Sequence, residues 1–213
     1  MAAEPLDQHS LGAAARLLSE RDPMLRAIHR AHGDPPLWAR DPGFATLVWI
    51  VLGQQVSLAS ATAAFERLRA ACGGTVTPQG VLRLEVPGLR GSGLTRQKAG
   101  YLVELSATVD TRRLDLNALD VLGDDEVRAR LVAQRGIGPW SADIYLLMAL
   151  RRPDVWPASD LALIEAVRQA AGFPQRPTSL AAAEYATRWR PWRSVAARML
   201  WQSYLVARGR PLE

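Results

Sequence analysis

Two glycines and the residues around them form the turn in this chain that is best suited to chemistry. Gly136 and Gly138 flank Ile137 after an apolar helical run that begins at Leu131. Such a turn adopts backbone angles that other residues resist, and Pro139 suits the first turn of the helix that follows. The turn leaves N–H groups unpaired, so it could bind a phosphate without any side-chain charge. A plain connection between two helices is the alternative.

A carboxylate follows this turn at the end of a short loop that contains prolines. In the segment DVWPASDLAL, Asp160 stands directly before an apolar helical segment. A fixed carboxylate stabilises positive charge that develops in a transition state, and it can orient an attacking water. Asp at this point would also serve as an ordinary helix N-cap, and the two roles are compatible. Asp154, six residues earlier, is the competing carboxylate.

Helical periodicity accounts for nearly the whole chain, while strand signals are almost absent. Capping residues and helix breakers divide the chain into helices. The sequence therefore predicts an all-α protein. The expected helices lie around Leu11–Leu18 and Leu25–Ile28, from Asp41 through Val51, from Ser57 to Cys72, from Thr95 through Leu105, from Asp124 to the glycine turn, from Pro139 to Leu150, and at Leu161–Ala171, Ser179–Arg188 and Pro191–Arg208.

Four motifs occur in a fixed order between residues 52 and 201. They are LGQQVSLASA, GIGPWSADIYLLMAL, DVWPASDLAL and RWRPWRSVAARMLW. Together they resemble the helix-hairpin-helix/GPD superfamily of DNA glycosylases, and within it the alkylation-repair branch, 3-methyladenine DNA glycosylase II.

The resemblance implies a two-domain helix-hairpin-helix DNA glycosylase fold with a cleft between the domains. Residues 38–148 would form a six-helix barrel domain that ends in the helix-hairpin-helix. Residues 1–37 together with 149–213 would form a second helical domain that carries Asp160. The segment Val86–Leu94 would be the turn between two barrel helices.

The same resemblance implies hydrolysis of an N-glycosidic bond in DNA. This bond breaks with oxocarbenium character at the sugar, and the stabilising carboxylate would be Asp160. Bifunctional relatives place a lysine two residues after the second glycine of the hairpin, to form a Schiff base with the sugar. Here that position holds Trp140, and we interpret the single lysine, Lys98, as a solvated helix residue. We therefore expect a monofunctional enzyme without a cofactor.

Aromatic side chains are the candidates for a base pocket. The alkylated bases 3-methyladenine and 7-methylguanine carry positive charge, which an indole face binds, and a flipped base must stack on something. The resemblance places pocket tryptophans at Trp140 and Trp201, with Ile144 at the family's tyrosine position and Tyr145 beside it. A role in the core is the interpretation kept for three other tryptophans: Trp38, Trp49 and Trp189.

The remaining candidates would hold DNA. Gln55 matches the family residue that fills the gap left by a flipped base, and Gln54 is its neighbour. The alternative is that both glutamines cap the end of a buried helix. The resemblance implies that the hairpin Gly136–Gly138 binds a DNA phosphate, and that the backbone of Gln134 and Ile137 is a candidate site for a monovalent ion. Four arginines are further candidates for phosphate contacts: Arg96, Arg135, Arg193 and Arg198.

Composition agrees with a polyanionic partner. The net charge is +5 and the pI is near 10.1, which permits binding to duplex DNA. Cys72 is the only cysteine, which excludes an intramolecular disulfide or a Cys-rich cluster and fits a reducing compartment. The N-terminus lacks the pattern of a signal peptide, and the longest apolar run, near Phe44–Leu52, is too short to span a bilayer. We expect a monomeric cytoplasmic protein at the bacterial nucleoid, without a membrane partner.

The sequence thus predicts a DNA glycosylase that excises alkylated purines from duplex DNA in base excision repair. One alternative is the same fold acting on another lesion, such as uracil, hypoxanthine or 1-methyladenine. Another is a non-catalytic helix-hairpin-helix module that binds DNA.

Overall fold

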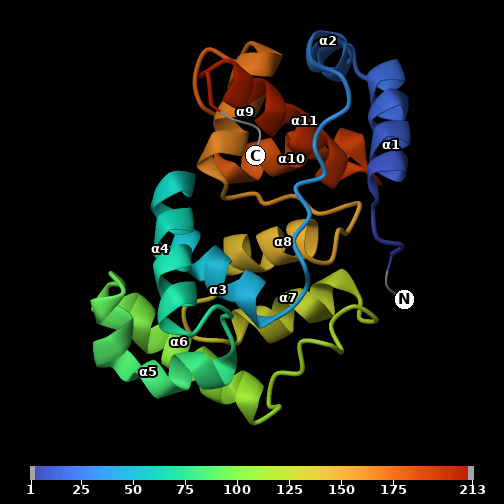
Figure 1. Ribbon diagram of the computed structural model, residues 1–213. Helices are drawn as coiled ribbons and strands as arrows, with labels where there is room; N and C mark the ends of the chain where they lie inside the picture. Colours follow the sequence, from blue (N-terminus) through green and yellow to red (C-terminus); the bar gives the residue numbers. More distant parts are fainter. Residues whose placement is uncertain (1–2, 211–213) are drawn as a thin grey trace. The chain divides into compact units, whose positions relative to one another are not determined.

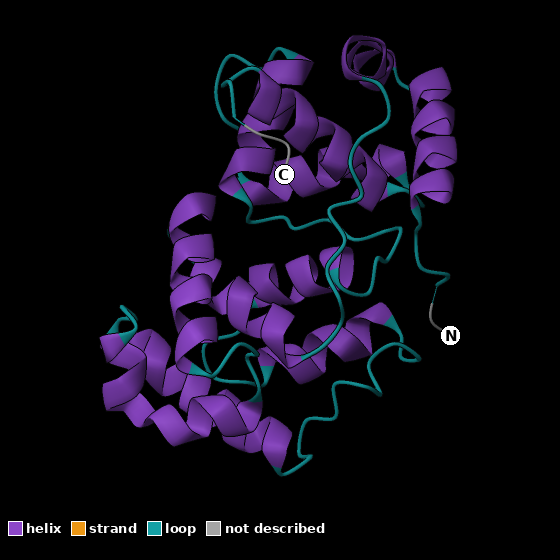
Figure 2. Cartoon of the chain, viewed as in Figure 1, coloured by secondary structure: helices purple, strands orange, loops and turns teal. Residues whose placement is uncertain are grey.

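The structure, a computed structural model, describes residues 3–210 as helices joined by loops (Figure 1, Figure 2). No strand occurs among these residues, which confirms the predicted all-α class. None of their helices is long and apolar enough to cross a membrane. In chain order the helices are α1 (Gln8–Arg21), α2 (Pro23–His32), α3 (Phe44–Gly53), α4 (Leu58–Ala71), α5 (Pro78–Gly91), α6 (Arg96–Asp110), α7 (Asp124–Val132), α8 (Pro139–Met148), α9 (Leu161–Ala171), α10 (Ser179–Tyr185), the 3₁₀ helix η1 (Ala186–Trp189) and α11 (Arg193–Val206).

The helices fall into two compact units. The first spans Arg40–Tyr145 and holds α3 to α7 with most of α8, while the second joins Ala3–Ala39 to residues 146–210 and holds the other helices. The six-helix barrel expected at 38–148, the second domain expected from 1–37 with 149–213, and the cleft between them stay predictions. Residues 1–2 and 211–213 of that second domain lie outside the described part of the chain.

Helix α3 forms the apolar centre of the first unit. Its residues from Thr46 to Leu52 are all buried, as expected for a helix that is apolar nearly all round. It packs against α4 and α6, and α5 lies along α6 (Figure 1). The helix begins at Phe44 rather than at Asp41, because Gly43 has a φ of 130°, which is outside the helical region.

Hydroxyl caps begin two helices of this unit where the sequence predicts them. The Ser57 hydroxyl accepts the N–H of Ser60 at the start of α4, and the Thr95 hydroxyl accepts the N–H of Lys98 at the start of α6. Helix α7 begins at Asp124, and its acidic first turn suits the positive end of the helix dipole.

The prediction of a turn over Val86–Leu94 is wrong, because the turn in the structure is shorter and begins later. Helix α5 runs from Pro78 to Gly91 with a break at Glu85, whose φ of 49° is not helical. The chain resumes a short helix after the break, and Pro87 fits there because the first helical turn does not need its N–H. Only Ser92 to Thr95 connect α5 to α6.

Helix α9 spans the predicted 161–171, whereas the last two helices differ from the prediction. The segment expected as one helix at 179–188 is α10 followed by the 3₁₀ helix η1. Helix α11 begins at Arg193 rather than at Pro191, and it ends at Val206. The residue before a proline is pushed towards extended angles, and Arg190 indeed has a ψ of 142°.

Helix α11 forms the centre of the second unit and packs against α9, α2 and α1. It also holds residues 32–38, which we call the strap. The strap begins at the last residue of α2 and precedes the first unit in the sequence. Two side chains of α11 donate to strap carbonyls: Gln202 to His32 and Asp34, and Arg198 to Leu37. The strap contains two prolines, which have no N–H group, so it cannot form a regular pattern of backbone hydrogen bonds. The side chains of α11 satisfy its carbonyl groups instead.

Candidate functional site

Asp160 is the N-cap of α9, as the sequence predicts. Its Oδ1 accepts the backbone N–H of Leu163 at 2.7 Å and the indole N–H of Trp201 at 3.3 Å. The side chain is partly exposed. The positive end of the α9 dipole and an indole donor therefore fix a carboxylate in one orientation while leaving it accessible.

The competing carboxylate, Asp154, has a structural role. Its two oxygens accept hydrogen bonds from the Arg193 guanidinium at 2.8 and 3.0 Å, and Oδ1 also accepts the Arg193 backbone N–H at 3.1 Å. This pair ties the loop before α9 to the start of α11. It also engages Arg193, which was a candidate for a phosphate contact.

Trp201 lies on α11 beside Asp160 and is buried. Its ring meets Trp38 edge to face, with ring centroids 6.4 Å apart and planes at 67°. The prediction that Trp38 belongs to the core is wrong, because its side chain is partly exposed and its backbone has a positive φ of 47°. The strap holds it at the surface of the unit, and its sequence position gave no indication of this.

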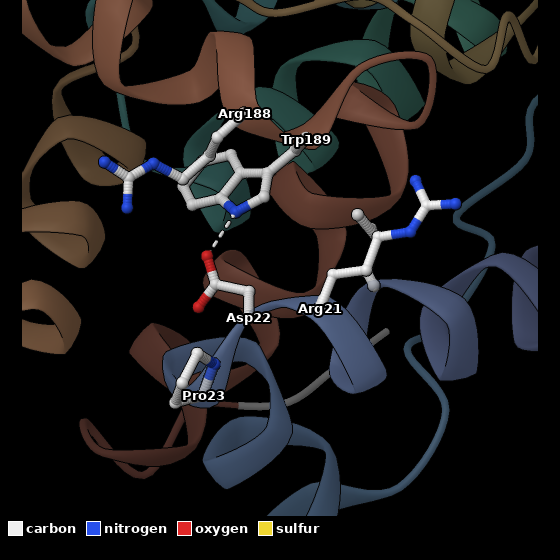
Figure 3. Close-up of a pocket in the computed structure, with 6 residues that line it drawn as sticks. Arg21, Asp22, Pro23, Arg188 and Trp189 are labelled. Atoms are coloured by element: carbon white, nitrogen blue, oxygen red, sulfur yellow. Dashed lines mark hydrogen bonds between the residues drawn. The ribbon is translucent and has the colours of Figure 1, made fainter.

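The other two tryptophans assigned to the core are buried, as predicted. The Trp189 indole N–H donates to Oδ2 of Asp22 at 2.8 Å. Figure 3 shows this bond between two residues that line a pocket together with Arg21 and Arg188. Trp49 lies in the first unit, with the Arg40 guanidinium 3.5 Å from its ring centroid.

The other predicted pocket residues lie in the first unit, on α8. Trp140, in the first turn, is partly exposed. Ile144 and Tyr145 are buried, and the Tyr145 hydroxyl accepts the N–H of Gly43 at 2.9 Å. Burial raises the pKa of Tyr145 to about 12. Ile144 and Tyr145 therefore occupy core positions, and of these three residues Trp140 is the one with accessible surface.

The glycine hairpin depends on Gly136 more than on Gly138. Gly136 has a φ of 86°, and a Cβ there would collide with the ring of Tyr101 on α6. Gly138 has an ordinary φ, and a Cβ there would meet nothing within 4 Å. The turn is closed by a hydrogen bond from the Ile137 N–H to the Gln134 carbonyl at 3.0 Å. A carbonyl keeps a second lone pair, so the monovalent ion expected at Gln134 and Ile137 is compatible with this turn and stays a prediction.

Gln54 and Gln55 have different surroundings. Gln54 ends α3, and its side-chain amide donates to the Gly136 carbonyl at 2.8 Å and to the Ser141 hydroxyl at 2.9 Å. It therefore ties the α3–α4 turn to the hairpin. Gln55 is exposed and has a positive φ of 59°, and the exposed side chain of Val56 follows it.

The interpretation of Lys98 as a solvated helix residue is wrong. Its ammonium donates to the carbonyl of Leu52 at 2.7 Å and to that of Gln54 at 2.9 Å. Lys98 thus caps the C-terminal end of α3 and holds the turn that presents Gln55. Desolvation by burial lowers the pKa of Lys98. The one available signal in the sequence is that this is the single lysine of an arginine-rich chain.

The arginine candidates for phosphate contacts differ in their exposure to solvent. Arg198 is fully buried, and besides Leu37 it donates to the carbonyls of Ser194 and Leu147, so its assignment as a phosphate contact is wrong. Burial lowers the pKa of Arg198 to about 9, which leaves it charged at neutral pH. Arg135 is exposed beside the hairpin and pairs with Glu104 at 2.6 Å.

The sequence is similar to those of base excision DNA repair proteins. A family model described as HhH-GPD superfamily base excision DNA repair protein matches residues 48–191. A putative DNA-3-methyladenine glycosylase of Bacillus subtilis is 26% identical over 186 residues, which are 84% of this chain and 65% of the relative. A probable bifunctional transcriptional activator/DNA repair enzyme of Mycobacterium tuberculosis is 36% identical over 195 residues, which are 84% of this chain and 37% of the relative.

Solved structures show the same fold. The 3-methyladenine DNA glycosylase of Schizosaccharomyces pombe, in complex with abasic DNA, superimposes with a TM-score of 0.81 at 24% identity, over 90% of this chain and 96% of that one. A DNA-3-methyladenine glycosidase of Bacillus halodurans gives a TM-score of 0.79 at 25% identity, over 92% of each chain.

This chain spans less than two thirds of the length of the relatives from Bacillus subtilis and Mycobacterium tuberculosis. The family match nevertheless covers most of its sequence, from α3 through η1, and includes the hairpin and Asp160. The chain belongs to the HhH-GPD superfamily of base excision DNA repair proteins.

Proposed function

We propose that this protein is a monofunctional DNA glycosylase that hydrolyses the N-glycosidic bond of alkylated purines in duplex DNA. The observation that carries the proposal is the arrangement around Asp160, where a helix N-terminus and the Trp201 indole N–H hold one accessible carboxylate. The names of the relatives, which are 3-methyladenine glycosylases, support alkylated purines as the substrate class.

Asp160 would act on the sugar rather than on the base. The C1′–N bond breaks, its electron pair leaves with the base, and the sugar acquires oxocarbenium character. The carboxylate stabilises this positive charge and orients a water molecule. The water adds to C1′ and loses a proton, which leaves an abasic site in an uncut strand. Because an alkylated purine is cationic and departs as a neutral base, the reaction needs no strong general acid.

The substrate would be held by aromatic and backbone groups. Trp201 and Trp140 would offer indole faces to the flipped cationic base. The N–H groups of the hairpin at Gly136–Gly138 would bind a DNA phosphate, and exposed Gln55 would enter the stack where the base has left it. We propose that the protein acts as a monomer on duplex DNA, at the bacterial nucleoid.

The absence of a lysine two residues after the second hairpin glycine supports the monofunctional assignment. Trp140 occupies this position. The single lysine, Lys98, has its ammonium bonded to two backbone carbonyls. It is therefore committed to the fold rather than available for a Schiff base with the sugar.

Base release from methylated DNA tests the proposal. Duplex DNA methylated with a radiolabelled methyl donor, and duplexes with a single hypoxanthine or uracil, are incubated with the protein, and released bases are separated by chromatography. We expect release of 3-methyladenine and 7-methylguanine, with strand breaks only after alkali. Release of uracil or hypoxanthine alone would reassign the lesion class. No release despite DNA binding would identify a non-catalytic module, and strand breaks without alkali would contradict the monofunctional mechanism.

A further inference from the structure

Trp38 is the aromatic residue whose placement the proposed chemistry leaves unexplained. It is partly exposed, lies in the strap, and meets Trp201 edge to face. Trp201 in turn donates its indole N–H to Asp160. The second unit therefore contains a continuous series of contacts from Trp38 through Trp201 to the proposed catalytic carboxylate.

The backbone of Trp38 is strained. Its φ of 47° lies in the left-handed region, which a bulky residue adopts rarely. Such a conformation persists only where the surrounding structure imposes it, and such residues gather at functional sites.

The strap supplies the constraint. The carbonyl of Leu37, directly before Trp38, accepts a hydrogen bond at 2.9 Å from Arg198, whose guanidinium is fully buried. One turn further along α11, Gln202 holds two more strap carbonyls. Because Trp201 lies between Arg198 and Gln202 on α11, the same helix places both members of the aromatic pair.

We propose that Trp38 is a further wall of the base pocket, which contacts the flipped alkylated base together with Trp201. This inference rests on the proposed function. Two indole planes at 67° form a corner, so a flat ring that stacks on one plane presents its edge to the other. In a methylated purine that edge carries part of the positive charge, which the negative face of an indole attracts. Trp38 thereby favours a cationic base over the neutral bases of undamaged DNA.

Substitution of Trp38 tests this role. The readouts are the single-turnover rate of 7-methylguanine release and the affinity for a duplex with an abasic site, which has no base to contact Trp38. We expect Trp38→Leu to lower the rate about tenfold, a loss in the range of one cation–π contact. The affinity for abasic DNA should stay within about twofold, because the DNA backbone contacts are intact. Trp38→Phe, which keeps an aromatic face, should recover most of the rate.

Two more variants keep the test decisive. Trp38→Gly removes the ring and suits the positive φ, so it reports on the pocket even where Trp38→Leu destabilises the strap. Trp192→Leu is the matched control, since Trp192 is also a partly exposed tryptophan of this unit, and it should leave the rate unchanged. An unchanged rate in Trp38→Gly, or an equal loss of abasic-DNA affinity, would overturn the pocket role. Failure of the unmodified protein to release any methylated base would instead overturn the proposed function, and this inference with it.

Discussion

Replacing Lys98 with methionine should loosen the turn that presents Gln55. The methionine keeps the length of the aliphatic stem but removes the ammonium that donates to the Leu52 and Gln54 carbonyls. These carbonyls lie at the C-terminal end of α3, where the last four carbonyls of a helix have no partners within the helix. A cation there also interacts favourably with the negative end of the helix dipole.

The size of the effect follows from the two hydrogen bonds. A hydrogen bond to a charged group contributes roughly 1.5–3 kcal/mol when it is shielded from water. The Lys98 side chain is only partly buried, and water can replace part of what is lost. We therefore expect the free energy of unfolding to fall by about 2 kcal/mol in Lys98→Met. For a chain of this length that corresponds to a fall in Tm of about 4–8 °C.

Thermal unfolding at neutral pH measures the change. Lys98→Arg keeps the positive charge but spreads its donors over a plane, so it should lose less than Lys98→Met. Arg96→Met, an exposed position on the same helix, is the matched control and should change the stability by less than about 0.5 kcal/mol. The affinity of Lys98→Met for abasic duplex DNA should also fall. A Tm for Lys98→Met equal to that of the control would refute the capping role.

Three further predictions concern the hairpin and the second unit. Gly136→Ala should reduce the affinity for duplex DNA more than tenfold and lower the Tm, because the new Cβ collides with the Tyr101 ring and the φ of 86° disfavours alanine. A titration with duplex DNA measures the affinity, and Gly138→Ala should have little effect on it. Asp22→Ala should lower the free energy of unfolding in denaturant by about 3 kcal/mol, since it removes the cap of α2 and the acceptor of a buried indole N–H. Asp22→Asn keeps one acceptor oxygen, enough for either the cap or the indole N–H, and should lose less. Hydrogen bonds from Arg168 and neighbouring side chains hold the pKa of Glu165 at about 2, below its ordinary 4.5. The ionised Glu165 therefore stabilises the folded protein fully above pH 4.5, and this contribution is lost as the pH falls towards 2. The free energy of unfolding of Glu165→Gln should depend less on pH between these values.

Local features of the site could be predicted from the sequence. The hairpin needs a residue that tolerates positive φ, and only glycine does so freely, which identifies the turn at Gly136. The Asp160 cap follows equally from residue type, because Asp before an apolar helical run is a preferred N-cap. Both features depend on residues within a few positions of one another along the chain.

Features that depend on distant contacts could not be predicted. Lys98 contacts carbonyls 44 and 46 residues away, and nothing in its own neighbourhood distinguishes it from a solvated lysine. The Leu37 carbonyl beside Trp38 is held by Arg198, 161 residues further along. The same holds for Tyr145, whose hydroxyl accepts a hydrogen bond from Gly43 and whose burial depends on the packing of the first unit.

We propose that Asp160 supplies a negative charge to catalysis in addition to capping α9, and the substitution Asp160→Asn separates these two roles. Asparagine caps a helix about as well as aspartate, so the Tm should stay within about 2 °C of that of the unmodified protein. The single-turnover rate of 7-methylguanine release should fall about 100- to 1000-fold, the usual cost of losing one electrostatic contact to a transition state. Asp154→Asn, which alters the carboxylate paired with Arg193, is the control and should retain the rate. A rate in Asp160→Asn equal to that of the unmodified protein would contradict the mechanism.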